Sequence, residues 1–363
     1  MTTLRDVFTA LAPESLERSP HLPLAHRRGM SAIQPCRSGH DGSSLSQCQH
    51  CGGQHRVHHA CGNRHGPQWQ PHTTHQWFPH HLDTQLPGPH VLLTFTVPET
   101  LRPCIRSPQR PAYQAMLHAS ATARTRLAAD ERCIGTDLPG FTGVLPPWGR
   151  QLQYHPHIHS IVPGGGLSKD RTTWQPSRAH FFVPVKALSP IDRAICKEDM
   201  PHASLLEHLD PQVWTLPWNV HSQAKHHGHA AFTSLAPYGF RVALSNSRIV
   251  GLTDRTVTVT YRKVGSARPR TTPLDAIAFL RRFLQHVLPD GFMQVRHFGL
   301  LHASGAIPLD TIRRLSVQVH PSEDQPPPRP PPPPRAARCP TWGAPRRVVM
   351  RRWTSHRDCV DTG

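Results

Sequence analysis

Apolar and polar positions along the chain change their spacing several times, and each change predicts a new element. Residues 90–98, HVLLTFTVP, form a β-prone run, and the second half of 99–131 has the spacing of a helix. The clearest amphipathic helix is LDAIAFLRRFLQHVL at 274–288, which collects its apolar side chains on one side and its arginines near the other. A last strand is expected at 293–301 and a last helix at 308–319.

Between these elements the pattern predicts mostly strands. The segment HAAFTSLAPYGF at 229–240 is typical of a short helix damaged by proline. Strands are expected at HFFVPV (180–185), at VWTLPWNV (213–220), and in a meander with turns near Asn246 and Asp254 formed by 240–245, 248–253 and 256–264. We therefore predict a mixed α+β domain between residues 85 and 320.

The two ends of the chain differ from this central part in composition and in the spacing of their apolar residues. Residues 1–30 are expected to form a helical lead-in, with the segment LRDVFTALAPESLERSP interrupted at Pro13 and Pro20. The segment 31–80 is rich in Cys, His and Gly and lacks aliphatic periodicity, so it needs a bound metal or another substitute for a hydrophobic core. The tract QPPPRPPPPPR at 325–335 is a polyproline II spacer, and the basic tail after it is expected to be disordered. The chain thus divides into 1–84, 85–320 and 321–363.

Charge and cysteine content narrow the possible functions. Of the 363 residues, 41 are Lys or Arg and 23 are Asp or Glu, which gives a formal net charge of +18. This excess favours a polyanionic partner, nucleic acid first. The sequence predicts neither a membrane span nor a signal peptide, so we expect a cytoplasmic protein. Nine cysteines without an export signal then favour metal binding over a disulfide framework.

The N-terminal cysteines have the spacing of a zinc site. Cys48 and Cys51 form a C-x2-C pair, and Cys61 is followed after three residues by His65. Two thiolates two residues apart can reach one tetrahedral Zn²⁺, and a second pair can complete the coordination. We therefore predict structural zinc on these four residues. The ligand set stays ambiguous because other candidates lie nearby: Cys36, His40, His55, His58, His59, His72 and His75.

The segment YHPHIHSIV places His155, His157 and His159 at every second position. Alternate side chains of a β-strand share a face, so the three imidazoles should project together while Ile158 and Val162 face the other way. Imidazoles at i and i+2 can chelate one divalent cation. Enzymes that cut single-stranded DNA use such a pair to hold a metal that polarises the scissile phosphate.

Three interpretations of this segment compete. It is a strand with accidental histidines in a chain that carries 29 of them, a histidine-triad nucleotide hydrolase, or a metal-plus-tyrosine nuclease. The nuclease interpretation requires a tyrosine on a downstream helix. Among Tyr113, Tyr154, Tyr238 and Tyr261, only Tyr238 lies on a helix-like segment after the histidines.

Three motifs in this order resemble the IS91 family of rolling-circle insertion-sequence transposases: CQHCGG followed by CGNRH, then HPHIH, then SLAPYGFRVALSNSRIVGL. The resemblance extends from the zinc segment to about residue 320. It implies an N-terminal transposase zinc-binding domain and a catalytic domain of the HUH nuclease superfamily, with a ferredoxin-like antiparallel sheet that binds single-stranded DNA ends. It also implies that His157 and His159 hold Mg²⁺ or Mn²⁺ and that Tyr238 forms a 5′-phosphotyrosine intermediate. His155 is our own candidate for a third ligand.

The chain departs from the family pattern at its chemically important positions. The family's zinc segment usually continues as Cys-Pro-x-Cys, whereas this chain has Gly66 and Trp69. Many relatives carry two tyrosines one helical turn apart, and here the first position is Ser234. Pro237 and Gly239 flank the remaining tyrosine and weaken its helix.

The tail segment CPTW, at 339–342, likewise looks like a C-x2-C pair without its second cysteine. Two further functions therefore stand beside an active transposase. One is a catalytically inactive remnant that still binds DNA, and the other is the histidine-triad hydrolase.

Overall fold

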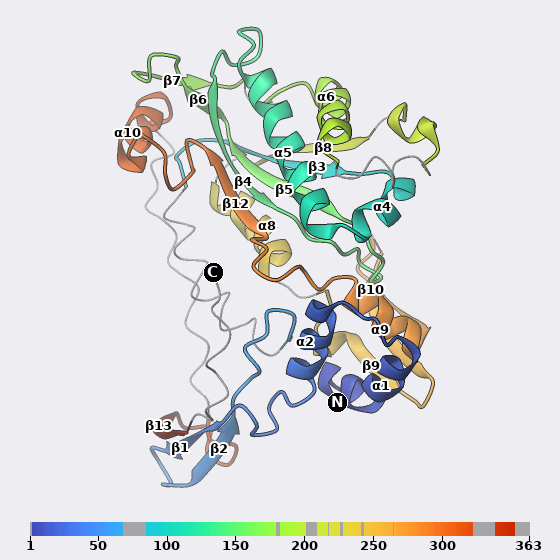
Figure 1. Ribbon diagram of the computed structural model, residues 1–363. Coiled ribbons are helices and arrows are strands. Elements are labelled where there is room, and N and C mark those ends of the chain that lie inside the picture. The colour runs from blue at the N-terminus through green and yellow to red at the C-terminus, as the bar shows by residue number, and fades with distance from the viewer. Residues whose placement is uncertain are drawn as a thin grey trace.

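The computed structural model describes residues 2–67, 85–178, 182–200, 209–216, 218–225, 228–240, 243–263, 265–321 and 338–352. Within these ranges the chain is a mixed α+β protein with three antiparallel sheets, as Figure 1 shows. Its helices are α1 (Leu4–Arg18), α2 (Leu24–Ile33), α4 (Arg102–Arg106), α5 (Gln109–Ala128), α6 (Val185–Asp199), α8 (Gly228–Phe240), α9 (Ala276–Leu284) and α10 (Leu309–Val319). No helix of the described part is long and apolar enough to cross a membrane.

The largest sheet is curled and has seven strands. Its order is β7-β6-β4-β5-β3-β8, and β12 pairs with β4 outside this path. The strands are β3 (His90–Thr96), β4 (Leu138–Val144), β5 (His157–Pro163), β6 (Gly165–Leu167), β7 (Trp174–Pro176), β8 (Asn219–Lys225) and β12 (Val295–Gly299). β5 pairs with both β3 and β4, so the predicted histidine strand lies near the centre of the sheet.

Alternation along the central strands gives the large sheet two apolar faces. One set of side chains, which includes Leu93, Phe95 and Ile158, packs with α5 and α6 in the main core. The alternate residues Leu92 and Ile161 pack with α8 in a second cluster. Figure 1 shows α5 and α6 on one side of the sheet and α8 on the other. The sheet is therefore covered on both faces, as its almost uniformly buried central strands require.

A second body surrounds a three-stranded meander. It contains β9 (Ile249–Leu252), β10 (Thr256–Arg262) and β11 (Pro269–Asp275), and its strands share a core with α1, α2 and α9. Phe8 of α1 contacts Phe283 of α9 with ring centroids 5.2 Å apart. The lead-in helix runs through Pro13, because a Thr3 capping box fixes its start and its apolar face is buried in this core.

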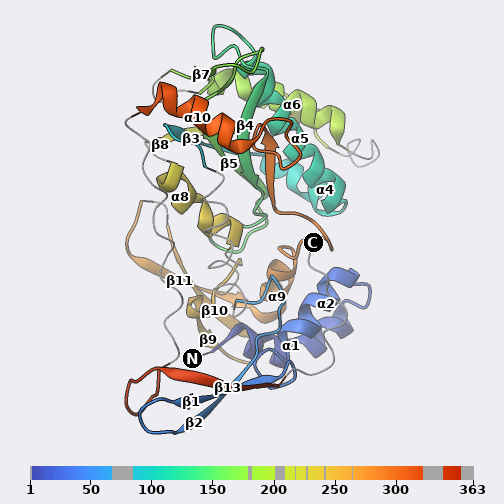
Figure 2. The same ribbon diagram turned by 90° about the vertical axis from the view of Figure 1, so that its left-hand side faces the viewer.

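The third sheet is small and joins the two ends of the chain. β1 (Ser43–Cys48) is its central strand, with β2 (Gln54–His58) on one side and β13 (Arg346–Arg352) on the other. In Figure 2 the red C-terminal strand lies beside the two blue N-terminal strands. The tail expected to be disordered is therefore a strand over 346–352, because the free edge of β1 supplies backbone partners for it.

Several expected elements differ from the observed ones. The strand predicted at HFFVPV is wrong for 182–185, where a turn leads into α6; residues 179–181 lie outside the described residues. Within VWTLPWNV the structure has a 3-10 turn, Pro211–Trp214, and β8 begins only at Asn219. The meander is confirmed, but its third strand is Pro269–Asp275 rather than FRVALS. In these segments the tertiary context overrode local β-propensity.

Candidate functional site: a histidine pair facing helix α8

His157 and His159 project from the same face of β5, as the alternation predicted. His159 lies opposite Thr94 of β3, and His157 lies opposite Thr96. Their rings are 4.7 Å apart between centroids, close enough for both to contact one ion. Ile158 between them belongs to the core on the opposite face, so the predicted division of the strand into two faces is confirmed.

Hydrogen bonds fix both imidazole rings through the same nitrogen. Nδ1 of His157 lies 2.6 Å from the backbone oxygen of His155, and Nδ1 of His159 lies 2.9 Å from Oγ1 of Thr94. When Nδ1 carries the proton and donates, the neutral ring offers Nε2 as its metal-binding atom. The sequence prediction did not include Thr94, which only the strand register brings beside His159.

Burial keeps this pair of imidazoles neutral. Desolvation lowers the pKa of His157 to about 3, helped by the neighbouring His159, and lowers the pKa of His159 to about 4. Neutral imidazole is the form that binds metals, so the pair suits a divalent cation at neutral pH. Burial also lowers the pKa of His155, whose ring centroid lies 5.0 Å from that of His157. His155 precedes the strand, and its role as third ligand stays a prediction.

Helix α8 covers the face of the sheet from which the histidines project. Phe232 and Leu235 of α8 pack with Leu92 and Ile161, two residues beyond His159 on the same face. A Cβ added at Gly228 would lie 2.9 Å from Cε1 of His90, so the helix starts beside the far end of β3. It must therefore run along the face toward the end of β5 that carries the histidine pair.

Two lengths set the expected position of residue 238. From residue 228 to residue 238 the helix rises about 15 Å at ~1.5 Å per residue. From His90 to Thr94, the neighbour of His159, the strand spans about 13 Å at ~3.3 Å per residue. The two distances agree, so the backbone at residue 238 is expected to reach the level of the histidines. The side chain of Tyr238 itself lies outside the described residues.

The other tyrosines lie elsewhere. Tyr113 and Tyr154 share a hydrogen bond of 2.9 Å between their hydroxyls, and Tyr113 is fully buried in the core on the opposite face. Tyr261 belongs to β10 of the meander. Ser234, one turn before Tyr238 on α8, donates its hydroxyl to the Ala230 carbonyl at 2.8 Å. Tyr238 is therefore the tyrosine whose helix lies on the histidine face.

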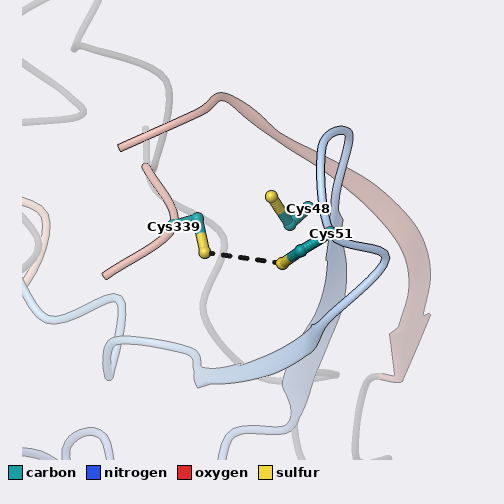
Figure 3. Close-up of side chains that lie close together, drawn as sticks. All are labelled: Cys48, Cys51 and Cys339. Carbon is teal, nitrogen blue, oxygen red and sulfur yellow. Dashed lines mark hydrogen bonds between the residues drawn. The ribbon is translucent and has the colours of Figure 1, made fainter. Parts of the chain in front are cut away.

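The structure regroups the predicted zinc ligands. The sulfur atoms of Cys48, Cys51 and Cys339 all lie within 4.8 Å of one another, and they face one another in Figure 3. This is the one group of three or more possible metal ligands among the described residues. Hydrogen bonds from the backbone of Trp342 and Thr341 lower the pKa of Cys339 to about 6, which favours the thiolate that zinc binds. The CPTW motif was the sequence signal for Cys339.

Cys61 and His65 are not brought to these three sulfurs. The Cys61 amide donates to the sulfur of Cys36 at 3.4 Å, and a thiol–thiol hydrogen bond lowers the pKa of Cys36 while raising that of Cys61. His65 accepts a hydrogen bond from the Leu288 amide through Nε2 at 3.4 Å. A Cβ at Gly66 would lie 3.0 Å from the sulfur of Cys61, so position 66 faces this second thiol pair.

Known proteins match two parts of the chain. Residues 140–307 match a family described as "Putative transposase", and residues 7–97 match a "Transposase zinc-binding domain". The histidine pair and α8 lie in the first match, and Cys48 and Cys51 lie in the second. Cys339 lies outside both.

Two relatives cover much of the chain. The putative transposase y4qJ of Sinorhizobium fredii is 30% identical over 316 residues, which cover 82% of this chain and 79% of the relative. The transposase for insertion sequence element IS801 of Pseudomonas savastanoi pv. phaseolicola is 26% identical over 233 residues, 58% of this chain and 53% of the relative. No solved structure gives a significant match. The chain therefore belongs to the IS91 family of insertion-sequence transposases, whose members are DNA-binding transposases with an N-terminal zinc-binding domain.

Proposed function

We propose that this transposase nicks and joins single-stranded DNA ends, with His157 and His159 holding Mg²⁺ or Mn²⁺ and Tyr238 acting as the nucleophile. The observation that carries the proposal is the position of α8. This helix packs on the histidine face of the sheet against Leu92 and Ile161, and its length is that needed to extend from His90 to the level of Thr94 and His159. A nucleophile on α8 and ligands on β5 would thus meet on one side of the sheet.

The chemistry assigned to these residues is a transesterification. The Tyr238 oxygen attacks the scissile phosphorus, the bond from phosphorus to the 3′ oxygen breaks, and the 3′ oxygen leaves with a proton as a free hydroxyl. The downstream strand stays attached to the enzyme as a 5′-phosphotyrosine. Attack by a second 3′ hydroxyl reverses the step and joins the strands. The metal, when bound, polarises the phosphate oxygens as a Lewis acid.

The strand order of the large sheet supports a ferredoxin-like core for the catalytic domain. Taken in chain order, β3, α5, β4, β5, α6 and β8 alternate as βαββαβ, and the four strands have the spatial order β8-β3-β5-β4 with antiparallel neighbours. On this order of elements we propose a split βαβ core for the domain. We accordingly propose a catalytic domain over 85–320, after a zinc-binding segment within 1–84 and before the tail from residue 321.

A covalent trapping assay tests the proposal. The full chain is incubated with Mn²⁺ and 3′-labelled single-stranded oligonucleotides tiled across both flanks of its gene. We expect a covalent adduct of the protein with the labelled strand that survives denaturing gel electrophoresis. The adduct should be absent in Tyr238→Phe, because the phenol oxygen that bonds the downstream strand is missing. Tyr261→Phe, which changes the same residue type in the meander, is the matched control and should keep the adduct.

The outcomes also separate the remaining functions. An adduct that persists in Tyr238→Phe would assign the nucleophile elsewhere. Salt-sensitive DNA binding without an adduct under any metal condition would identify an inactive binding protein, as the Ser234 and Pro237 departures allow. A histidine-triad hydrolase would release product from a nucleoside phosphoramidate without Tyr238, and the transposase relatives speak against it.

A further inference from the structure

We propose that His55 is the fourth ligand of a zinc site formed with Cys48, Cys51 and Cys339, and that this site fastens the C-terminal strand to the N-terminal sheet. The zinc-binding family match ends at residue 97, so it gives Cys339 no role. The inference concerns the zinc segment and does not depend on the proposed cleavage chemistry.

Two segments, residues 48–53 and residues 339–344, have the same turn conformation. The Cys48 amide donates to the Gly53 carbonyl at 2.9 Å, and the Gly52 amide donates to the Cys48 carbonyl at 3.0 Å. The tail repeats this pattern. The Cys339 amide donates to the Ala344 carbonyl at 2.8 Å, and the Gly343 amide donates to the Cys339 carbonyl at 2.8 Å. Gly52 and Gly343 also share a left-handed backbone, with φ of 70° and 64°. Both segments therefore fold as turns that present a cysteine sulfur toward a common point, as C-x2-C zinc ligands do.

The equivalence of the turns shows which ligand the tail lacks. Cys339 corresponds to Cys48, and Trp342 corresponds to Cys51. Trp342 is 61% exposed and its ring packs against His50, with centroids 4.9 Å apart. Indole is not a zinc ligand, so the site has three thiolates and needs one further donor to reach the four of a structural site.

His55 is the side chain placed to supply that donor. It lies on β2 directly opposite Ser46 of β1, two residues before Cys48. Its Nε2 is 3.7 Å from the sulfur of Cys339, and the sulfurs of Cys51 and Cys339 are 4.0 Å apart. Tetrahedral bonds of about 2.3 Å to sulfur and about 2.0 Å to nitrogen predict ~3.8 Å between two sulfurs and ~3.5 Å between sulfur and nitrogen. The contact of His55 with Cys339 and that between the two sulfurs match these distances, whereas His55 lies outside the group of three sulfurs within 4.8 Å of one another, so its ring must move toward them to complete the site.

The site joins residues that are far apart in the sequence. Cys339 precedes β13, which pairs with β1 from Ser43↔Arg352 to Cys48↔Arg346. The sheet alone gives this strand one hydrogen-bonded neighbour and leaves Val349 and Met350 half exposed. A metal bonded to both turns would therefore stabilise the pairing, and its removal should release the strand.

Metal binding by the full chain tests the ligand set. We expect Cys339→Ser and His55→Ala each to weaken zinc binding at this site on the order of 100-fold. Each variant removes one of four ligands, and a 100-fold loss of affinity corresponds to about one quarter of the binding free energy of a structural site. His50→Ala is the matched control, because His50 lies in the same turn but packs against Trp342. With Co²⁺ in place of zinc, the visible bands should be those of three sulfurs and one nitrogen, and His55→Ala should change them.

A cysteine introduced at position 342 tests whether His55 is a zinc ligand or only supports the fold. Trp342→Cys should convert the cobalt spectrum to that of four sulfurs, and in this background His55→Ala should no longer weaken binding. An equal loss in both backgrounds would overturn the assignment of His55. Unchanged affinity in Cys339→Ser would overturn the role of the tail.

Limited proteolysis tests the attachment of the strand. Removal of zinc by a chelator should increase the rate at which trypsin cleaves after the arginines of β13, both in the wild-type chain and in His50→Ala. If zinc-loaded and chelated protein were cut within 338–352 at the same rate, the metal would not fasten the strand.

Discussion

Thr94 and the His155 carbonyl orient the two imidazoles of the candidate catalytic site. Each contacts Nδ1 of one ring, at 2.9 Å for Thr94 with His159 and at 2.6 Å for His155 with His157. Partners of this kind fix the tautomer and direction of metal-binding histidines. His155 thus has a defined position through its backbone, whether or not its ring also binds the ion.

The Thr94 hydroxyl gives a prediction at this scale. Thr94→Val keeps the shape of the side chain and removes the hydrogen bond to His159. We expect it to lower metal affinity or the rate of adduct formation about 10- to 100-fold, the usual effect of removing such a partner. Metal titration of the trapping assay measures the change.

Thr94→Ser is the conservative control, since it retains the hydroxyl and should recover most of the activity. Thermal unfolding of both variants shows whether the fold is kept. Wild-type activity in Thr94→Val would mean that the hydrogen bond does not orient a catalytic ligand.

At the scale of elements, the segments after α2 and after β2 bring together a second pair of thiols. Cys36 follows α2, Cys61 follows β2, and position 66 faces the sulfur of Cys61. Two thiols are too few for a structural zinc, which takes four ligands. The chain therefore keeps this segment in place by other contacts, among them the hydrogen bond of Arg64 to the Phe292 carbonyl at 2.8 Å.

Restoring the missing cysteines should complete this second site. The double variant Gly66→Cys with Trp69→Cys restores the Cys-Pro-x-Cys segment and is expected to bind one more zinc per chain than the wild type, because two further thiolates give the four ligands of a structural site. Metal analysis of the purified proteins gives the count. In a Cys36→Ser background the extra zinc should be lost, and its retention there would exclude Cys36 from the site.

At the scale of the molecule, the partly buried His65 connects the zinc segment to the chain just after α9, and the buried His286 lies within the body around α9. Nε2 of His65 accepts from the Leu288 amide at 3.4 Å, and Nε2 of His286 lies 3.1 Å from the Leu152 carbonyl. Burial lowers the pKa of His65 to about 3 and that of His286 to about 4. Both are therefore neutral in the folded protein near neutral pH.

This burial predicts acid destabilisation. Below pH ~6.5 the unfolded chain takes up protons on these histidines while the folded chain does not, so stability falls with pH until about pH 3 to 4. Each histidine should contribute a loss of about 2 kcal/mol between pH 7.5 and pH 5. Denaturant unfolding at both pH values measures it.

His65→Gln removes one titrating group and should reduce the pH dependence by about 2 kcal/mol. His302→Gln is the control, since His302 lies in an exposed turn and its side chain hydrogen-bonds Ser304 in its own loop. An unchanged pH dependence in His65→Gln would show that His65 does not stay neutral in the folded chain.

The histidine strand, the main helices and the basic character could all be derived from the sequence, because alternation and charge are local properties of the chain. The same reasoning failed where pairing decided the structure. HFFVPV has high β-propensity, yet residues 182–185 lead into α6, and the basic tail pairs with β1 rather than remaining without structure. Spacing along the chain also grouped Cys48 and Cys51 with Cys61, whereas the sheet brings Cys339 to them.

The sequence by itself identified the candidate residues for chemistry: a His pair on one strand face, a tyrosine on a later helix and thiols at both ends. Only the tertiary structure decided which of them meet. It set α8 on the histidine face, Thr94 beside His159 and the tail cysteine beside the N-terminal pair. The reason is physical. Side-chain direction follows from local periodicity, but strand register and contacts across hundreds of residues depend on burying both faces of a sheet at once.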